Sequence, residues 1–413
     1  MRKMVTPDEA REIVLQQCPA LPSQTRAHDE IFGCTLARDI VADVELPPFD
    51  NSAMDGYAVI AADFENESEV TLRVLETIAA GVMPTETVVR GTCSQIMTGA
   101  PIPAGCDAVV MREETERVDE TTVRFTARVQ RGQNIRLAGS DVRRGETVLR
   151  AGTIIRAAEW GMLASLNQAE VEVFGLPRVA VVTTGDEVVA PGAEIKPGQI
   201  RDSNSFTIAG LLRACGAETA SQLKSGDSDD TLRAALQQCL QTCDAIITSG
   251  GVSAGDFDPV RDVLPQVGEV HFYKIAMKPG KPVMFATMQH DGRTVPVFGL
   301  PGNPVSVMVA FEQFVRPALL QMQGRSATQR VALRVAVQSS HRSPVGKVEY
   351  VRAKVQPNSA TPAGWTADIA GNQGSGRLSS MTSANALLVI PADVTQLCAG
   401  DVVTAQMTDW PEI

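Results

Sequence analysis

Acidic residues follow the strongest apolar runs in the second half of the chain. Asp186 and Glu187 come just after the run RVAVVTT (178–184), and Asp258 closes the loop that follows the run DAIITS (244–249). Carboxylate oxygens are the usual ligands of hard cations, and Mg2+ commonly takes one or two of them together with substrate phosphates. These positions predict a site for a divalent cation, to which Asp227 would also contribute.

The same loops carry groups that suit an anion. Gly250 and Gly251 let backbone N–H groups approach a phosphate, and Ser253 adds a hydroxyl donor. Asn303 stands at the start of a predicted helix, whose N-terminus favours negative charge. Positive charge gathers in the loop KIAMKPGKP, which contains Lys274, Lys278 and Lys281. Together these features predict binding of a phosphate or pyrophosphate group.

Familiar nucleotide-binding motifs do not fit this pattern. No G-x-G-x-x-G follows the first apolar run, and the P-loop pattern fails because proline follows the lysine in GKP. Two structural alternatives stay open: the glycine-rich loop as a simple tight turn, and the lysine cluster as a solvated face. Several such features at successive strand ends nevertheless favour a binding site.

The elements that must position these loops alternate between strand and helix. This alternation over residues 176–325 predicts a doubly wound α/β domain with a mainly parallel sheet, which binds ligands at the carboxyl ends of its strands. Residues 44–141 are rich in short β-like runs, and residues 326–413 alternate with a period of two, which predicts a small antiparallel barrel or sandwich. Residues 1–43 and 142–175 are predicted to form a discontinuous, mixed α/β linker domain. The fold class is therefore a multidomain α/β and β protein.

Composition limits the partners. The 413 residues carry a net charge of −11, which argues against nucleic acid because phosphate neutralisation needs basic surface. No run is long and apolar enough for a membrane span and no signal peptide is expected, so a cytoplasmic protein is predicted. The eight cysteines contain no CxxC pair and are expected to be reduced thiols. The four histidines are isolated, and each is expected to be surface or core filler rather than catalytic.

A second group of polar loops lies in the β-rich region. The segment PPFDNSAMDGYAV (47–59) holds Asp50 and Asp55 in a stiff stretch, and its spacing excludes an EF-hand calcium loop. The loops IMTGAPIPAG (96–105) and GQNIRLAGSDV (132–142) add Thr98, Arg136 and Asp141. A plain Asx-turn is the structural alternative for the first segment.

These motifs, taken in order, closely resemble one family. PPFDNSAMDGYAV, IMTGAPIPAGCDAVVM, GQNIR, TTGDEV, SGGVSAGDFD, KIAMKPGKP and GLPGNPVS are similar to the motifs of molybdopterin molybdenumtransferases, the family that includes the E domain of gephyrin. The resemblance covers essentially the whole chain. Each motif alone is weak, but the ordered set is highly specific.

The resemblance implies a function and an assembly. Family members insert molybdate into adenylylated molybdopterin in a Mg2+-dependent reaction that hydrolyses the adenylate and releases AMP and molybdenum cofactor. They are homodimers whose site lies between the molybdopterin-binding α/β domain of one subunit and the β-rich domain of the other. A molybdopterin adenylyltransferase is the expected upstream partner.

The resemblance also implies roles for individual residues. Expected catalytic residues are Asp55, Thr98, Arg136, Asp141, Lys274 and Lys278. Expected cofactor-binding residues are Gly250, Gly251, Ser253, Asp227, Lys281, Pro301, Asn303 and Ser375. Expected metal ligands are Glu187, Asp258 and Asp186. Ser375 and Asp227 match the family pattern more loosely than the others.

Two other functions remain as alternatives. The α/β region alone is also typical of an enzyme that makes the adenylate, although the β-rich region and the DNSAMDGYA segment argue against it. A non-catalytic cofactor-binding scaffold is the alternative from a different class.

Overall fold

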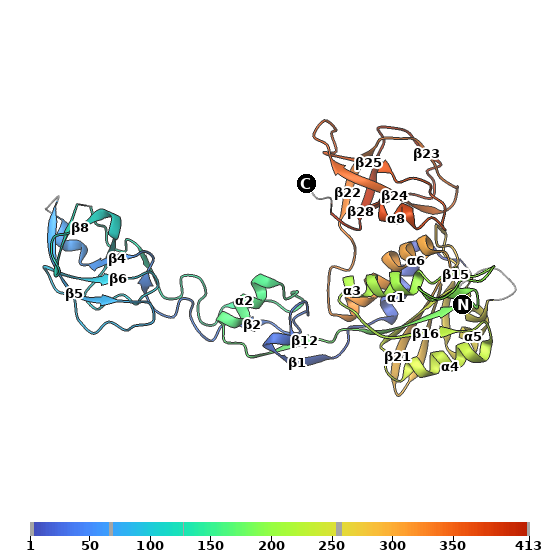
Figure 1. Ribbon diagram of the computed structural model, residues 1–413, viewed down its shortest axis with the longest axis horizontal. Helices are drawn as coiled ribbons and strands as arrows, with labels where there is room; N and C mark the ends of the chain where they lie inside the picture. Colours follow the sequence, from blue (N-terminus) through green and yellow to red (C-terminus); the bar gives the residue numbers. More distant parts are fainter. Residues whose placement is uncertain (1–3, 66–68, 127, 253–257, 411–413) are drawn as a thin grey trace. The chain divides into compact units, whose positions relative to one another are not determined.

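The computed structural model describes residues 4–65, 69–126, 128–252 and 258–410 (Figure 1). Contacts divide the chain into two compact units. The larger unit comprises Met1–Ala37, Gly152–Ile155 and Val171–Ile413, and the smaller unit comprises Arg38–Ala151 and Arg156–Glu170. Among the described residues, no helix has the length and apolarity needed to cross a membrane.

The larger unit contains a six-stranded sheet. Its strands, in spatial order, are β16 (Glu218–Ser225), β13 (Arg178–Thr184), β17 (Ala245–Ser249), β21 (Arg293–Leu300), β20 (Met284–His290) and β18 (Glu269–Tyr273). The first four run parallel, and β20 is antiparallel to both of its neighbours. The predicted, mainly parallel sheet is therefore confirmed. Strand β16 was not foreseen, because its sequence ETASQLKS is polar and it lies at an edge with only Ser225 fully buried.

Helices cover both faces of this sheet. Val179 and Val181 of β13 belong to one hydrophobic core, whereas Ala180 and Val182 belong to a second, because successive side chains of a strand point to opposite faces. The first core is built with helices α1 (Pro7–Gln17), α3 (Asn204–Ala214), α6 (Pro304–Ala310) and α7 (Arg316–Met322). The second is built with helices α4 (Asp229–Leu240) and α5 (Pro259–Val267), which lie together in Figure 1. This arrangement is the expected doubly wound α/β fold.

Capping groups mark the starts of three helices. Thr6 and Glu9 form a capping box at α1, with Thr6 N 2.8 Å from Glu9 Oε2. Ser228 caps α4, its side chain accepting from Thr231 N. Asn303 occupies the N-cap position of α6, at the start of the helix that the sequence predicted, but its side chain makes no capping hydrogen bond. Helix α6 continues as a π-helix, η4 (Phe311–Val315), before α7 begins.

The C-terminal region is a closed five-stranded barrel. The strands are β22 (Ala332–Val337), β24 (Val348–Pro357), β25 (Trp365–Ile369), β26 (Ala386–Ile390) and β28 (Val402–Met407). Closure follows because β24 pairs with both β25 and β26. The barrel is not wholly antiparallel, since β22 and β25 pair in parallel. The short strand β19 (Met277–Lys278) joins the outside of β24, and the remaining elements here are β23 (His341–Arg342), β27 (Gln396–Leu397) and α8 (Ser379–Thr382).

The smaller unit contains a second six-stranded sheet. Its order is β7 (Ala108–Met111), β4 (Gly56–Val59), β6 (Thr92–Ile96), β5 (Val70–Ile78), β9 (Thr122–Phe125) and β8 (Thr115–Arg117). Tyr57, Leu72 and Phe125 lie in its main core. Two short ladders join β3 (Asn51–Ser52) to β10 (Ile135–Arg136) and β2 (Ile40–Val41) to β11 (Thr147–Leu149), and α2 (Ala157–Ser165) completes the unit. The predicted β-rich character of this region is confirmed.

The remaining elements are short. Strand β1 (Ser23–Ala27) pairs with β12 (Glu170–Phe174), and β14 (Val188–Val189) pairs with β15 (Ile200–Arg201). Single 3₁₀ turns are η1 (His28–Glu30), η2 (Ala61–Phe64) and η3 (Arg112–Glu114).

The first helix packs on the α/β sheet rather than on the linker segments with which the sequence grouped it. Ala10 and Val14 of α1 are fully buried in the same core as Leu319 of α7. Just before the helix, Val5 N donates to Lys274 O (3.2 Å) and Ala276 N donates to Val5 O (2.8 Å). The start of the described chain is thus fastened to the lysine-containing loop. The division of the chain into four domains stays a prediction.

Candidate functional site

Loops at the carboxyl edge of the α/β sheet enclose a cavity of about 700 Å3. The strands that lead to it, β13, β17 and β21, end at Thr184, Ser249 and Leu300. The lining contains seven of the predicted site residues, namely Glu187, Asp227, Gly250, Gly251, Asp258, Pro301 and Asn303. The sequence placed these residues at successive strand ends, and the parallel sheet brings them to one edge.

The glycine-rich loop needs glycine for its backbone shape. Gly250 has φ +95°, and a Cβ there would lie 2.6 Å from Thr184 Oγ1. The N–H of Gly250 donates to Leu300 O (3.1 Å), so this donor holds neighbouring strand ends together instead of pointing at a ligand. Ser253 lies outside the described residues.

Asn204 joins two of the loops around this cavity, and the sequence reasoning did not find it. Its Nδ2 donates to Ser249 Oγ (2.9 Å) and to Gly302 O (2.8 Å). The first turn of α3 thereby fixes the loops after β17 and β21 relative to each other. The signal was the motif DSNS at the start of that helix, whose polar residues have no role in an ordinary amphipathic pattern.

The acidic residues suit a sparsely coordinated cation. Glu187 and Asp258 both line the cavity, and Asp258 is 5% exposed. Asp227 Oδ2 accepts from Asp186 N (3.1 Å), and Asp186 itself is not among the lining residues. Within the described ranges, no cluster of three or more His, Cys, Asp or Glu side chains could hold a metal ion. Glu187 and Asp258 line the same cavity, and Mg2+ commonly takes one or two carboxylates while the substrate's phosphates supply the other oxygens.

A second cavity of about 500 Å3 adjoins the first. Pro282, Pro301 and Asn303 line both. The second cavity is bounded by Lys278, Lys281 and Lys347 and by the loop 372–375 of the C-terminal region, which includes the predicted Ser375. Lys347 was not predicted, because it lies far along the chain from the other lysines. The three ammonium groups make this cavity suited to an oxyanion.

Lys274 is separated from the other lysines of its loop. Its backbone has φ +73°, and its Nζ lies 4.7 Å from the centroid of the Tyr273 ring. It is not among the residues lining either cavity. Closeness in sequence therefore did not place all three predicted lysines together.

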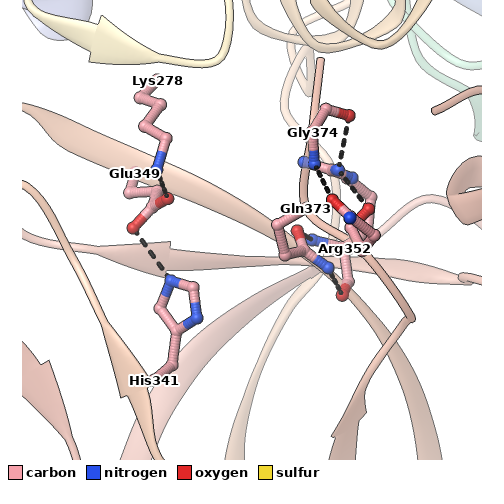
Figure 2. A network of polar contacts seen from close by, with 7 residues as sticks. Lys278, His341, Glu349, Arg352, Gln373 and Gly374 are labelled. Atoms are coloured by element: carbon pink, nitrogen blue, oxygen red, sulfur yellow. Dashed lines mark hydrogen bonds and ion pairs between the residues drawn. The ribbon is translucent and has the colours of Figure 1, made fainter. Parts of the chain in front are cut away.

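Lys278 is paired with a buried carboxylate. Its Nζ lies 2.8 Å from Glu349 Oε1, and Glu349 Oε2 lies 3.0 Å from His341 Nε2 (Figure 2). Glu349 is 2% exposed. Burial alone raises the pKa of a carboxyl group, but hydrogen bonds from Lys278 and His341 outweigh that effect and hold the pKa of Glu349 below its ordinary value. His341, which the sequence suggested to be isolated, is thus part of a polar chain that ends at the second cavity.

Arg352 organises the loop on the other side of this cavity. Its guanidinium group is buried and donates to Ser380 Oγ (3.1 Å), Gly374 O (3.2 Å) and Asn372 O (3.3 Å). The side chain of Gln373 bonds the backbone of Arg352 in both directions, as Figure 2 shows. The loop that lines the cavity is therefore held by strand β24. Neither Glu349 nor Arg352 was predicted, since a charged residue in an alternating strand looks like an outward-facing one.

In the smaller unit, two predicted residues contact each other directly. Asp55 Oδ1 accepts from both the backbone N and the Oγ1 of Thr98, each at 2.7 Å. The backbone hydrogen bond and then the hydroxyl bond of Thr98 lower the pKa of Asp55, which is exposed. Arg136 of β10 lies opposite Asn51 of β3 in the short ladder that these two strands form. Asp141 N donates to Leu46 O (2.9 Å). All four predicted residues of this unit are exposed.

The segment that carries Asp55 is braced from within. Asp50 Oδ1 accepts from Ala138 N (2.7 Å), and Ser52 Oγ donates to Met54 O (2.5 Å). Gly56 is required by its neighbours, because a Cβ there would lie 1.9 Å from Val110 O. The stiffness that the sequence suggested has these contacts as its cause.

The fold and the matching family descriptions place the protein among molybdopterin-binding biosynthetic enzymes. Residues 180–321, which form the doubly wound sheet and its loops, match the description "Probable molybdopterin binding domain". Residues 5–167 match "MoeA N-terminal region (domain I and II)", and residues 334–407 match "MoeA C-terminal region (domain IV)".

The chain belongs to the molybdopterin molybdenumtransferase (MoeA) family. It is 38% identical over 404 residues to "Molybdopterin molybdenumtransferase 2" of Mycobacterium tuberculosis, covering 95% of this chain and 96% of that protein. It is 35% identical to "Molybdopterin molybdenumtransferase" of Haemophilus influenzae, covering 98% of each. The crystal structure of the molybdopterin biosynthesis moeA protein from Pyrococcus horikoshii OT3 is similar, with a TM-score of 0.80, 31% identity, and coverage of 98% of this chain and 100% of that chain. The protein is therefore a transferase of molybdenum cofactor biosynthesis.

Proposed function

We propose that the protein inserts molybdate into adenylylated molybdopterin in a Mg2+-dependent reaction that hydrolyses the adenylate and releases AMP and molybdenum cofactor. The observation that supports this most is the pair of adjoining cavities in the larger unit. One carries carboxylates and a glycine-rich loop, and the other carries three lysines. A substrate with a phosphate bridge and an oxyanion reactant needs both kinds of surface.

The residues divide the work by their charge. Lys278 and Lys281 would bind phosphate oxygens, and Asn303 and Ser375 would bind the neighbouring part of the substrate at the rim between the cavities. Lys274 would act from beside the site. Glu187 and Asp258 would hold Mg2+, with Asp186 and Asp227 supporting them, and the bound ion would neutralise phosphate charge. Preorganised lysines stabilise the charge that develops when the bond to the adenylate phosphorus breaks.

The smaller unit would serve a partner subunit in a homodimer. Asp55, Thr98, Arg136 and Asp141 are exposed, and the braced loop around Asp55 gives its carboxylate a fixed direction. We propose that they position molybdate and the attacking group in the partner's site. The proposed setting is the cytoplasm, with a molybdopterin adenylyltransferase supplying the substrate.

Release of AMP tests the reaction. The protein is incubated with molybdopterin adenylate, Mg2+ and molybdate, and AMP is quantified by chromatography. Release that needs both ions supports the proposal. Accumulation of adenylate from ATP and molybdopterin would instead support an adenylyltransferase, and binding without any turnover would support a scaffold.

A mixing experiment tests the shared site. Asp55→Asn and Lys278→Ala variants are each expected to lose most of their activity at substrate concentrations near the wild-type KM, while their circular dichroism stays that of the wild type. Mixed and allowed to exchange subunits, they should recover up to a quarter of wild-type activity, since about one site in four then carries neither substitution. Mixed samples that exchange subunits but stay inactive would contradict the shared site.

A further inference from the structure

The carboxylate of Glu349 is buried beside the second cavity, where removing its charge from water is unfavourable. It is 2% exposed, and both its oxygens are occupied, one by Lys278 Nζ at 2.8 Å and one by His341 Nε2 at 3.0 Å. Burying an ion costs several kcal/mol, so a paired and buried carboxylate adds little net stability compared with an apolar side chain. A role in orienting its partner accounts for it better than stability does.

The two partners are brought together by strand pairing. β19, which ends in Lys278, adds in parallel to β24 of the barrel, with Lys278 in register with Glu349. Val348 N also donates to Ala276 O (3.0 Å), which extends the attachment by one residue. The barrel therefore supplies a carboxylate at a fixed position next to a lysine that belongs to the α/β part of the chain.

The lysine side chain keeps donors for a ligand. An ammonium group has three N–H donors, and the contact with Glu349 Oε1 uses one of them. Lys278 is half-exposed and lines the second cavity, so its other donors are available there. A lysine side chain loses rotamer entropy when it binds a ligand, and an existing ion pair removes part of that cost before the ligand arrives.

We propose that Glu349 is a positioning residue, through which the C-terminal barrel holds the ammonium group of Lys278 at the second cavity for a tetrahedral oxyanion of the substrate, phosphate or molybdate. This inference rests on the proposed function for the identity of the anion. Glu349 touches no substrate; it acts through Lys278. The pairing also gives the C-terminal barrel a part in the site, beyond the lining by the loop 372–375.

A double-mutant cycle separates positioning from other roles. The KM values for molybdate and for molybdopterin adenylate, and kcat, are measured for the wild type, Lys278→Ala, Glu349→Ala and the double variant. Loss of a charged hydrogen bond raises the KM for the anion that Lys278 binds by about 10- to 100-fold. Where Lys278 is present, Glu349→Ala should raise the same KM about tenfold. Where Lys278 is already replaced by alanine, Glu349→Ala should raise that KM less than about twofold. The KM that responds identifies the anion as phosphate or molybdate.

Two further variants keep the result interpretable. Glu349→Gln retains an oxygen facing Lys278 and should keep the KM within about threefold of the wild type, because the position of the ammonium group is preserved. Glu312→Gln is the matched control: Glu312 is also a buried carboxylate of this unit, paired with Arg330 at 2.9 Å, but it lines neither of the two cavities. It should leave both KM values unchanged.

The outcomes differ for each explanation. Equal effects of Glu349→Ala with and without Lys278 would overturn the proposal in favour of a structural role. A KM in Glu349→Gln more than about threefold below that of the wild type would also overturn it, since the carboxylate would then act only by repelling the anion. If the wild type releases no AMP, the proposed function fails. The coupling between Glu349 and Lys278 can still be tested by calorimetry, which measures the binding of molybdate alone and of inorganic pyrophosphate alone to the same four proteins.

Discussion

Replacing Gly56 with alanine tests whether the sheet of the smaller unit fixes Asp55. A Cβ at this position would lie 1.9 Å from Val110 O and 2.9 Å from Val110 C. Because real contacts of this kind lie at 3.0 Å or more, β4 and β7 would have to move apart by about 1 Å. Val110 O and Val110 C are backbone atoms of a paired strand, so no side-chain rotation relieves the clash.

The expected loss of stability is about 3 kcal/mol. Overpacking costs roughly 1–3 kcal/mol, and the weakened pairing of β4 with β7 adds about 1 kcal/mol. The hydrogen bond from Arg112 N to Asp55 O (3.0 Å) lies at the end of this ladder. Displacement there also turns Asp55 away from Thr98, so activity should fall by more than the unfolded fraction explains.

Gly161→Ala is the matched control in the same unit. Gly161 lies inside helix α2, where an added Cβ would meet nothing within 4 Å. Alanine there should stabilise the helix by about 0.8 kcal/mol. Thermal unfolding, with hydrogen exchange of the amides of residues 56–59 and 108–111, compares the two variants. Wild-type exchange and melting temperature for Gly56→Ala would refute the reasoning, because they would show that the strands have room to spare.

Three further predictions concern individual charges. Thr98→Val should raise the pKa of Asp55 only part of the way to its ordinary value, since the backbone N–H of residue 98 still donates; an NMR titration showing no change would contradict the assigned cause. Arg330→Met should lower the free energy of unfolding, measured in urea, by about 3 kcal/mol, because the buried Glu312 loses its 2.9 Å partner and keeps the more distant Arg316 at 3.9 Å. Adding Glu312→Gln should recover part of that loss. The pKa of Glu349 is lowered on folding, so its stabilisation is present above about pH 4.3 and is lost as the pH falls below that value. The difference in urea midpoint between wild type and Glu349→Gln should therefore shrink from about pH 6 to about pH 3.5, and a constant difference would contradict the shift.

The sequence predicted the elements whose physics is local. β13 and β17 are continuous apolar runs, and the Thr6 capping box marks the start of α1, so both appeared directly in the pattern. Strand β16 was missed because an edge strand needs no apolar alternation. The packing of α1 was misjudged because its apolar face fits any core, and only the tertiary fold decides which.

The candidate site divides in the same way. Glu187, Asp258 and Gly250 follow strand ends, and a parallel sheet gathers such positions at one edge, so their meeting could be foreseen. Lys274 and Lys278 are close in sequence, yet Lys278 lines the second cavity whereas the Nζ of Lys274 lies over the Tyr273 ring. The pairing of Lys278 with Glu349 depends on the register between β19 and β24, and no local pattern carries that information.

The attachment of Val5 to Lys274 and Ala276 has a consequence for how the chain matures on the ribosome. The smaller unit has all its residues once position 170 has been synthesised, and it can fold while the rest is still being made. Helix α1 emerges long before its partners, which are Leu319 in α7 and the residues of the lysine loop that bind Val5. Its apolar face must wait exposed throughout that interval. A chaperone that recognises short apolar helices is therefore expected to bind nascent chains at residues 7–17 and to be released only when synthesis has passed α7.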